Sequence, residues 1–195
     1  MEGPLYVAGA PVEHGFARLD DGTDENGHPL VMQGTVYDAE GKPAPGAQVE
    51  VWHCDTRGFY SHFDPTGKQA PFNMRRTIIA DEQGRYGFRS IVPSGYGVPP
   101  GSPTEKLLTA LGRHGQRPAH IHFSLYGRQF TERLVTQMYF PNDPLFFQDP
   151  IYNAVPKGAR ERMIAVFDYD ETRENFALGY KFDIVLRGRN ATPFE

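Results

Sequence analysis

Residues 117–127, RPAHIHFSLYG, alternate in the manner of a β-strand and contain two of the chain's seven histidines. Side chains two positions apart on a strand point to the same face, so His120 and His122 aim at one point and Ile121 at the opposite side. The pair fits either a polar strand face in water or one half of a metal site. The rest of the chain decides between these two interpretations.

The composition indicates one β-rich globular domain. A chain of 195 residues is long enough to bury a core, and 21 glycines and 17 prolines favour short strands joined by tight turns. A net charge of −4 provides no long-range attraction to nucleic acid or to an anionic membrane. A signal segment and a long apolar window are not found, and Cys54 is the single cysteine. These features predict a cytoplasmic chain without disulfides, in which Cys54 is a small buried or edge residue.

Strand-like runs recur between turn signals along the whole chain. About eight such runs predict an antiparallel β-sandwich that forms a single domain over residues 1–195. We expect Tyr86 and Phe88 to share one face of a hairpin-like pair formed by residues 75–81 and 85–91. The predicted strands are 31–38, 47–53, 75–81, 85–91, 119–127, 133–140, 162–170 and 178–188.

One helix interrupts the strands, in GSPTEKLLTALGRHG (101–115). Pro103 suits the first turn, and either Ser102 or Thr104 can cap it. Leucines at helical spacing follow, and Gly112 supplies the stop. The segment lies between the predicted sandwich strands, so we expect it to project from the sandwich.

A His-x-His strand serves several kinds of metal site. The ferrous facial triad requires an acid where this chain has His122, and structural zinc sites usually need more cysteines than Cys54 alone. A catalytic zinc with three histidines stays open. The candidates for the third ligand are His14, His28, His53, His62 and His114.

Two tyrosines fall in loops, where a core tyrosine is unusual. Tyr60 lies in TRGFYSHFD (56–64) and Tyr96 in VPSGYGVPPG (92–101), although each also fits a tyrosine on a surface turn. Phenolate is a hard anionic oxygen donor that suits Fe(III) better than zinc. Two phenolates and a hydroxide would balance the charge of Fe(III), and two neutral imidazoles would complete the coordination.

The order Tyr60, Tyr96, His120-x-His122 resembles that of the intradiol ring-cleaving dioxygenases, which hold non-haem Fe(III) on a β-sandwich. The blocks that carry the resemblance are EGPLYVAGAP (2–11), VWHCDTRGFYSHFD (51–64), FNMRRTIIADEQGRY (72–86), IVPSGYGVPPGSPT (91–104) and LGRHGQRPAHIHF (111–123). Within the family these blocks look most like catechol 1,2-dioxygenases. Residues 136–152 and 180–195 look more like the catalytic chain of protocatechuate 3,4-dioxygenase.

The resemblance implies a function and a set of site residues. The expected Fe(III) ligands are Tyr60, Tyr96, His120 and His122. Tyr96 and His122 would be axial, and Tyr96 would detach as the substrate chelates. Arg117 would stabilise negative charge on the substrate ring, with Gln137 nearby. The implied reaction is cleavage of catechol or a substituted catechol by O2 to cis,cis-muconate, in aromatic degradation and without an organic cofactor. The expected substrate-contacting residues are Pro4, Leu5, Arg117, Pro150 and Ile151.

The resemblance leaves alternatives open. Protocatechuate or hydroxyquinol is the alternative substrate, although the apolar Pro150 and Ile151 offer no cation for a ring carboxylate. A non-catalytic subunit or a binding sandwich is the alternative class of protein, against which the presence of all four ligands argues. Because the sequence begins with Met1 directly before the EGPLY block, we expect the family's N-terminal helical region to be absent. Its absence would open the mouth of the pocket and remove the usual route to a homo-oligomer.

Overall fold

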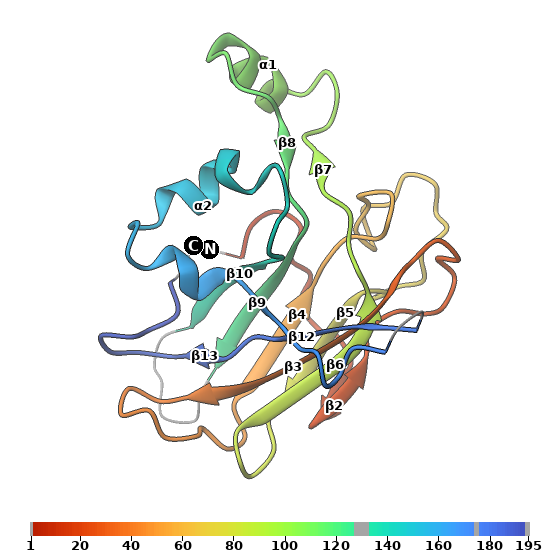
Figure 1. Cartoon of the computed structure of the whole chain (residues 1–195). Coiled ribbons are helices and arrows are strands. Elements are labelled where there is room, and N and C mark those ends of the chain that lie inside the picture. Colours follow the sequence, from red (N-terminus) through yellow and green to blue (C-terminus); the bar gives the residue numbers. More distant parts are fainter. Residues whose placement is uncertain (1, 127–132, 174–175, 194–195) are drawn as a thin grey trace.

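The computed structural model describes residues 2–126, 133–173 and 176–193. Two β-sheets pack face to face around a shared core (Figure 1). The first sheet carries the histidine strand in fourth place. Its strands in spatial order are β1 (Val12–His14), β5 (Arg75–Ile79), β4 (Gln48–Trp52), β9 (His120–Tyr126) and β10 (Leu134–Tyr139).

The second sheet is built around the longest strand, β3. Its strands in spatial order are β11 (Val166–Phe167), β12 (Leu178–Lys181), β3 (Pro29–Tyr37), β6 (Arg85–Ile91) and β2 (Phe16–Arg18), and β13 (Ile184–Val185) also pairs with β3. The predicted sandwich is confirmed, and its central pairs are antiparallel. The pairs β1–β5, β2–β6, β12–β3 and β13–β3 are parallel, so both sheets are mixed.

The core forms from the inward side chains of both sheets. Along β3, buried residues alternate strictly with half-buried ones, as expected for a strand that covers a core on one face. Val49 and Val51 of β4 point into this core, and so do Tyr86 and Phe88 of β6, as predicted. The opposite face of the first sheet is therefore free to carry polar groups.

The predicted hairpin of residues 75–81 and 85–91 is wrong. The turn between β5 and β6 closes tightly, because Gly84 N donates to Asp81 O at 3.0 Å. Beyond the turn, however, β5 pairs in the first sheet and β6 in the second. Ile78 and Phe88 both belong to the core, so the two strands meet across the layers instead of within one sheet.

Two further strand predictions need correction. Only residues 166–167 of the run 162–170 form a strand. Residues 162–163 belong to the 3-10 helix η2 (Arg160–Met163), and Ile164 forms an isolated bridge with Tyr139. The run 178–188 divides into β12 and β13 because Phe182 turns into the core between them. Residue 127, the end of the predicted strand 119–127, lies outside the described residues.

Helix α1 (Pro103–Ala110) projects beyond the sandwich, as expected (Figure 1). Ser102 caps it by accepting a hydrogen bond from Glu105 N. Its leucine stripe faces solvent, with Leu107 62% and Leu111 61% exposed. The helix is joined to the body by the short ladder of β7 (Tyr96–Gly97) and β8 (Gln116–Arg117). None of the helices in the described residues has both the length and the apolar character needed to cross a bilayer.

A short helical segment that the sequence analysis did not predict lies between β10 and η2. It consists of η1 (Phe146–Gln148) followed by α2 (Pro150–Ala154), whose N-cap is Asp149. Phe146 and Tyr152 pack against Tyr139 of β10 in a small second cluster. This cluster holds Asp149 against the end of the first sheet.

Candidate metal centre

The two strand histidines lie on the outer face of the first sheet, as their spacing predicted. His120 and His122 are both buried, and their ring centres are 4.9 Å apart. Ile121 points to the core on the other side of β9. Trp52 of β4 stacks on His122, with ring centres 4.9 Å apart and planes 4° from parallel. This stack fixes the plane of the His122 ring.

Tyr96 reaches the histidines from the β7–β8 ladder. Its Cα partner in that ladder is Arg117, and its ring centre lies 5.3 Å from that of His120. Gly95 makes the close approach of the two segments possible, because a Cβ there would overlap the backbone oxygen of Arg117. The Gly-Tyr-Gly sequence therefore places one phenol beside the histidine strand.

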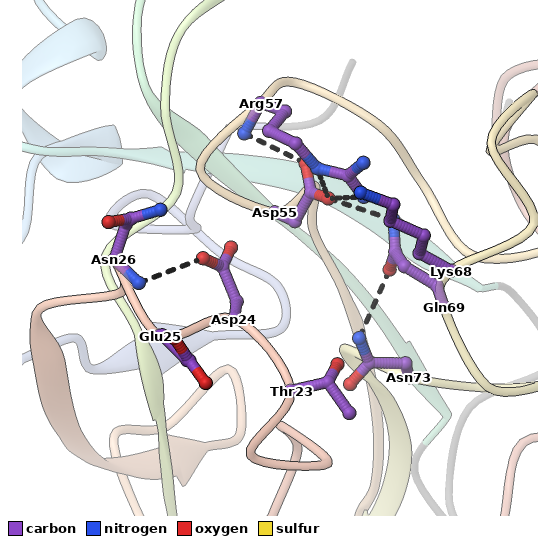
Figure 2. A pocket seen from close by; sticks show the side chains of 9 residues that line it. All are labelled: Thr23, Asp24, Glu25, Asn26, Asp55, Arg57, Lys68, Gln69 and Asn73. Carbon is purple, nitrogen blue, oxygen red and sulfur yellow. Dashed lines mark hydrogen bonds and ion pairs between the residues drawn. The ribbon is translucent and has the colours of Figure 1, made fainter.

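Tyr60 reaches the same place from a loop built around a buried carboxylate. Asp55 accepts hydrogen bonds from Arg57 N and Phe59 N, both at 2.9 Å. Its other oxygen accepts from the guanidinium of Arg57 and from Gln69 Nε2 (Figure 2). These bonds shape the turn 55–59 and deliver Tyr60 to the interior with 2% of its surface exposed.

A polar cavity of about 330 Å³ lies on the outer side of this turn, and Figure 2 shows the side chains around it. The residues that line it are Thr23, Asp24, Glu25, Asn26, Asp55, Arg57, Lys68, Gln69 and Asn73. None of the four predicted ligands is among them. The cavity is therefore a feature of the supporting loops and is separate from the ring cluster.

The four rings form a closed cluster. The ring centres of Tyr60 and Tyr96 are 5.7 Å apart at 89°, and those of Tyr60 and His122 are 6.1 Å apart. With the Tyr96–His120 and His120–His122 contacts, each ring touches two others. The structure thus brings together all four residues that the sequence analysis selected.

Both imidazoles are kept neutral. Burial, and then the charge of Arg117, lower the pKa of His120 to about 3. Burial, and then His120, lower the pKa of His122 well below its usual value. His120 Nδ1 lies 2.8 Å from the carbonyl oxygen of Pro118, so Nδ1 is the protonated nitrogen and Nε2 keeps a lone pair. Neutral imidazole with the second nitrogen bound to a carbonyl is the usual form of a histidine metal ligand.

The phenol of Tyr60 fits a cation. Its Oη is buried without a hydrogen-bond partner among the described residues, although buried hydroxyls normally have one. Burial, and then Tyr96, raise its pKa well above the usual value, so the phenol alone stays protonated at neutral pH. A metal cation would ionise the phenol and supply the missing partner. Two phenols and two neutral imidazoles therefore form a donor set that fits a hard trivalent ion.

Arg117 borders the cluster in a fixed position. Its Nη2 donates to Asp149 Oδ2 at 2.8 Å and to Gln137 Oε1 at 2.6 Å. Its Nη1 lies 3.0 Å from His120 Nε2 and 3.4 Å from Tyr96 Oη. Burial opposes the guanidinium charge, but hydrogen bonding to Asp149 outweighs it and raises the pKa of Arg117. A permanent cation thus faces the position where the four rings meet.

The residues predicted to contact substrate are placed less directly. Leu5 packs against the hydrophobic cluster that includes Trp52 and Tyr60. Pro150 and Ile151 open α2, directly after the Asp149 that pairs with Arg117. Pro4 and Pro150 are exposed, and Leu5 and Ile151 are half-buried.

The other histidines stay apart from the cluster. His53 is buried, but its two nitrogens lie 2.7 Å from Cys54 O and 2.7 Å from Ser90 Oγ, and burial lowers its pKa to about 4. His114 bonds Gln148 at the surface. His14, His28 and His62 are exposed. Among the described residues, no group of three histidines, cysteines or acids is arranged to bind a metal, which removes support for a three-histidine zinc site.

Cys54 is buried, as predicted. Its Sγ donates to the carbonyl oxygen of Ser94 at 3.3 Å. Burial, and then the charge of Asp55, raise the pKa of the thiol to about 12. Such a thiol is protonated at neutral pH and serves as packing beneath Tyr60.

Three side chains around the cluster were not selected from the sequence. They are Asp149, which pairs with Arg117; Trp52, which stacks on His122; and Arg75, which lies over Tyr60. Burial lowers the pKa of Arg75 to about 10, so its guanidinium is still charged at neutral pH. Trp52 had a local signal, because Val49 and Val51 of the same strand face the core and Trp52 therefore lies on the opposite face, two positions after Glu50. Asp149 and Arg75 had none.

The sandwich and its ring cluster define the class of protein as a metalloenzyme candidate with mixed phenol and imidazole donors. The chain belongs to the intradiol dioxygenase family: residues 1–188 match the family described as Dioxygenase (Dioxygenase_C). Catechol 1,2-dioxygenase of Acinetobacter baylyi is 57% identical over 152 residues, which are 78% of this chain and 49% of that protein. The protocatechuate 3,4-dioxygenase beta chain of Burkholderia cepacia is 42% identical and covers 98% of this chain and 80% of its own length.

A solved structure supports the same assignment. The structure of catechol 1,2-dioxygenase from Acinetobacter sp. ADP1 inhibited by bound mercury superposes with a TM-score of 0.82 at 49% identity. The match covers 95% of this chain and 60% of that one. The predicted resemblance to both the catechol and the protocatechuate branches is confirmed. The chain spans about half the length of the catechol 1,2-dioxygenases that it matches.

Proposed function

We propose that this chain is an Fe(III)-dependent intradiol dioxygenase that cleaves catechol, or a substituted catechol, with O2 to cis,cis-muconate. Both oxygen atoms enter the product, so the reaction needs no external reductant. The observation that carries the proposal is the closed cluster of two phenols and two neutral imidazoles, in which Tyr60 Oη is buried without a partner among the described residues. The proposed ligands are Tyr60, Tyr96, His120 and His122.

The metal would supply Lewis acidity, which favours the ionised forms of the phenols and of the diol. The chain's own residues would then divide two tasks. Tyr60 is fully buried and held by its loop, which suits a permanent ligand. Tyr96 is only half-buried, which suits a ligand whose Oη leaves and accepts a proton from the diol.

Arg117 would stabilise negative charge that develops on the substrate ring. Its guanidinium lies 3.4 Å from Tyr96 Oη, so it reaches the edge of the site where a diol would bind. Asp149 and Gln137 hold it from the opposite side. A charge fixed in this way before the reaction does not have to reorient as the ring becomes anionic.

The proposed substrate wall consists of Pro4, Leu5, Pro150 and Ile151, which is apolar and matches a neutral ring. Relatives are named for catechol, chlorocatechol, hydroxyquinol and protocatechuate, all small aromatic diols. We also propose a single domain, a cytoplasmic location and a capacity to form homo-oligomers. The single buried cysteine supports the reducing compartment.

The first test is the visible absorption spectrum of the purified protein without O2, before and after catechol is added. We expect a broad tyrosinate-to-iron charge-transfer band that moves to longer wavelength with catechol. Rates of O2 uptake with catechol, protocatechuate and hydroxyquinol then rank the substrates. A protein that contains no iron and takes none up would contradict the proposal and favour a binding sandwich or a non-catalytic subunit.

A further inference from the structure

Arg75 begins β5 and belongs to a row of side chains that crosses the first sheet. Its Cα partner is Trp52, which is paired on its other side with His122, and His122 is paired with Gln137. Directly opposed residues of neighbouring strands share one face. The row therefore runs from Arg75 beneath the ring cluster to Gln137, the residue that binds Arg117. One guanidinium lies at each end.

Arg75 contacts the chain at Tyr60 in two ways. Its Nε donates to Ser61 Oγ at 2.9 Å and its Nη2 to Ser61 O at 3.1 Å, so it fixes the backbone directly after Tyr60. Ser61 Oγ in turn donates to Asn73 O at 2.7 Å. The guanidinium carbon lies 5.7 Å from the centre of the Tyr60 ring. With 1% of its surface exposed, Arg75 makes these contacts away from solvent.

The charge of Arg75 is not balanced in the way that the charge of Arg117 is. Arg117 pairs with the buried Asp149, whereas the described residues provide no carboxylate that forms an ion pair with Arg75. In the same part of the chain, Arg75 Nη1 has no hydrogen-bond partner. A buried cation without a counter-charge is unfavourable. An ionised Tyr60 would provide this counter-charge, because its ring already lies beneath the guanidinium.

We propose that Arg75 is a positioning residue for the metal ligand Tyr60: it holds the segment at Ser61 and stabilises the metal-bound phenolate by its charge. This inference rests on the proposed function, because it requires Tyr60 to bind the metal. The two guanidiniums then have separate tasks. Arg117 faces the substrate side of the site, and Arg75 faces the ligand that stays bound.

The test compares iron-loaded Arg75→Gln with the parent protein by two measurements, the charge-transfer band and the affinity for Fe(III). Removal of the cation raises the energy of the phenolate electrons, so we expect the band to move to longer wavelength. Loss of a residue that orients a metal ligand typically weakens metal binding by about 10- to 100-fold. We expect a loss in this range.

Two variants distinguish the effect of the charge of Arg75 from the effect of its contacts. Arg76→Gln is the matched control, because Arg76 is the next arginine: its Nη1 donates to the backbone oxygens of Phe72 and Arg75, and its Nε lies 4.0 Å from Glu13 Oε1. We expect the control to keep the band and the affinity of the parent. Arg75→Lys keeps the charge but does not reproduce both contacts with Ser61. We expect its band to stay in place while its affinity falls.

The outcomes distinguish this inference from the proposed function. If the parent itself gives no charge-transfer band with Fe(III), the proposed function fails. If the parent gives the band and Arg75→Gln leaves it unmoved with an affinity change below about twofold, the inference alone is overturned. If circular dichroism shows that Arg75→Gln does not fold, Arg75→Lys and Ser61→Ala decide. Unchanged iron affinity in both of these variants would overturn the inference.

Discussion

The ion pair between Arg117 and Asp149 should carry much of the stability of the site, and Asp149→Asn tests this. The pair joins Nη2 to Oδ2 at 2.8 Å, with 12% of the arginine side chain and 0% of the aspartate side chain exposed. Asparagine keeps the size of the residue and the oxygen that caps α2, but it leaves the guanidinium without its counter-charge. Removing one partner of a buried pair costs about 3 to 5 kcal/mol.

We expect the lower end of that range, about 3 kcal/mol, because Gln137 Oε1 still accepts from Arg117 at 2.6 Å. For a chain of this size, such a loss lowers Tm by roughly 6 to 12 °C. The assay is urea unfolding of the metal-free protein at pH 7, followed by circular dichroism. Asp81→Asn is the matched control, because Asp81 pairs with Arg85 at the surface, with 30% and 66% of the side chains exposed. The control should lose less than about 1 kcal/mol.

A double-mutant cycle decides whether charge is the cause. Arg117→Met also leaves one buried charge unpaired, so the double variant should lose less stability than the sum of the two single losses. Asp149→Asn should therefore cost much less in the Arg117→Met background than in the parent. An equal cost in both backgrounds, or a cost as small as that of Asp81→Asn, would refute the reasoning.

Three further predictions concern the metal-free protein. Burial holds three histidines neutral, two with a pKa of about 4 and about 3 and the third well below its usual value. Unfolding lets each bind a proton near pH 6.5, so the free energy of unfolding should fall as pH drops below 6.5, by up to about 1.4 kcal/mol per pH unit for each histidine. Urea midpoints that stay level from pH 7 to pH 5 would contradict this. Gly95→Ala should cost about 1 to 3 kcal/mol because its Cβ overlaps the Arg117 backbone, whereas Gly158→Ala, with open space around it, should be tolerated in the same unfolding assay. Leu107→Ser should change stability by less than about 0.5 kcal/mol, since Leu107 is 62% exposed, and a larger loss would show that α1 packs against something.

The sequence predicts best those features that depend on short spacings. His120 and His122 share a face because they are two apart on a strand, and this holds in any sheet that accepts the strand. Ser102 caps α1 because its side chain reaches Glu105 N within one turn. The convergence of Tyr60 and Tyr96 came from resemblance to a family, because spacing alone does not bring two loops together.

The wrong predictions arise where a short sequence pattern is compatible with two different tertiary arrangements. The turn that ends at Gly84 joins β5 and β6 closely, but its sequence does not determine whether the two strands pair in one sheet or belong to two sheets. Ile78 and Phe88 settle the matter, since both are buried in the core between the layers. In the same way, Asp149-Pro150 marks the start of a helix, while its ion pair with a residue 32 positions earlier leaves no local trace.

The buried charges of the site, taken together, determine the charge of the ligands that it prefers. Arg117 and Asp149 cancel, the two imidazoles are neutral, and Arg75 leaves one positive charge beside Tyr60. Electrostatics of this kind favour ligands that enter as anions, because an anion relieves the unpaired cation in a region of low dielectric. Under the proposed function, the ionised phenol of Tyr60 is the anion that pairs with Arg75, and the diol binds to the metal through two ionised oxygens. A monophenol of the same size lacks the second oxygen, so it should bind the iron-loaded protein much more weakly than catechol, and isothermal titration without O2 measures the difference. Equal affinities would show that the ring, and not the charge of the two oxygens, drives binding.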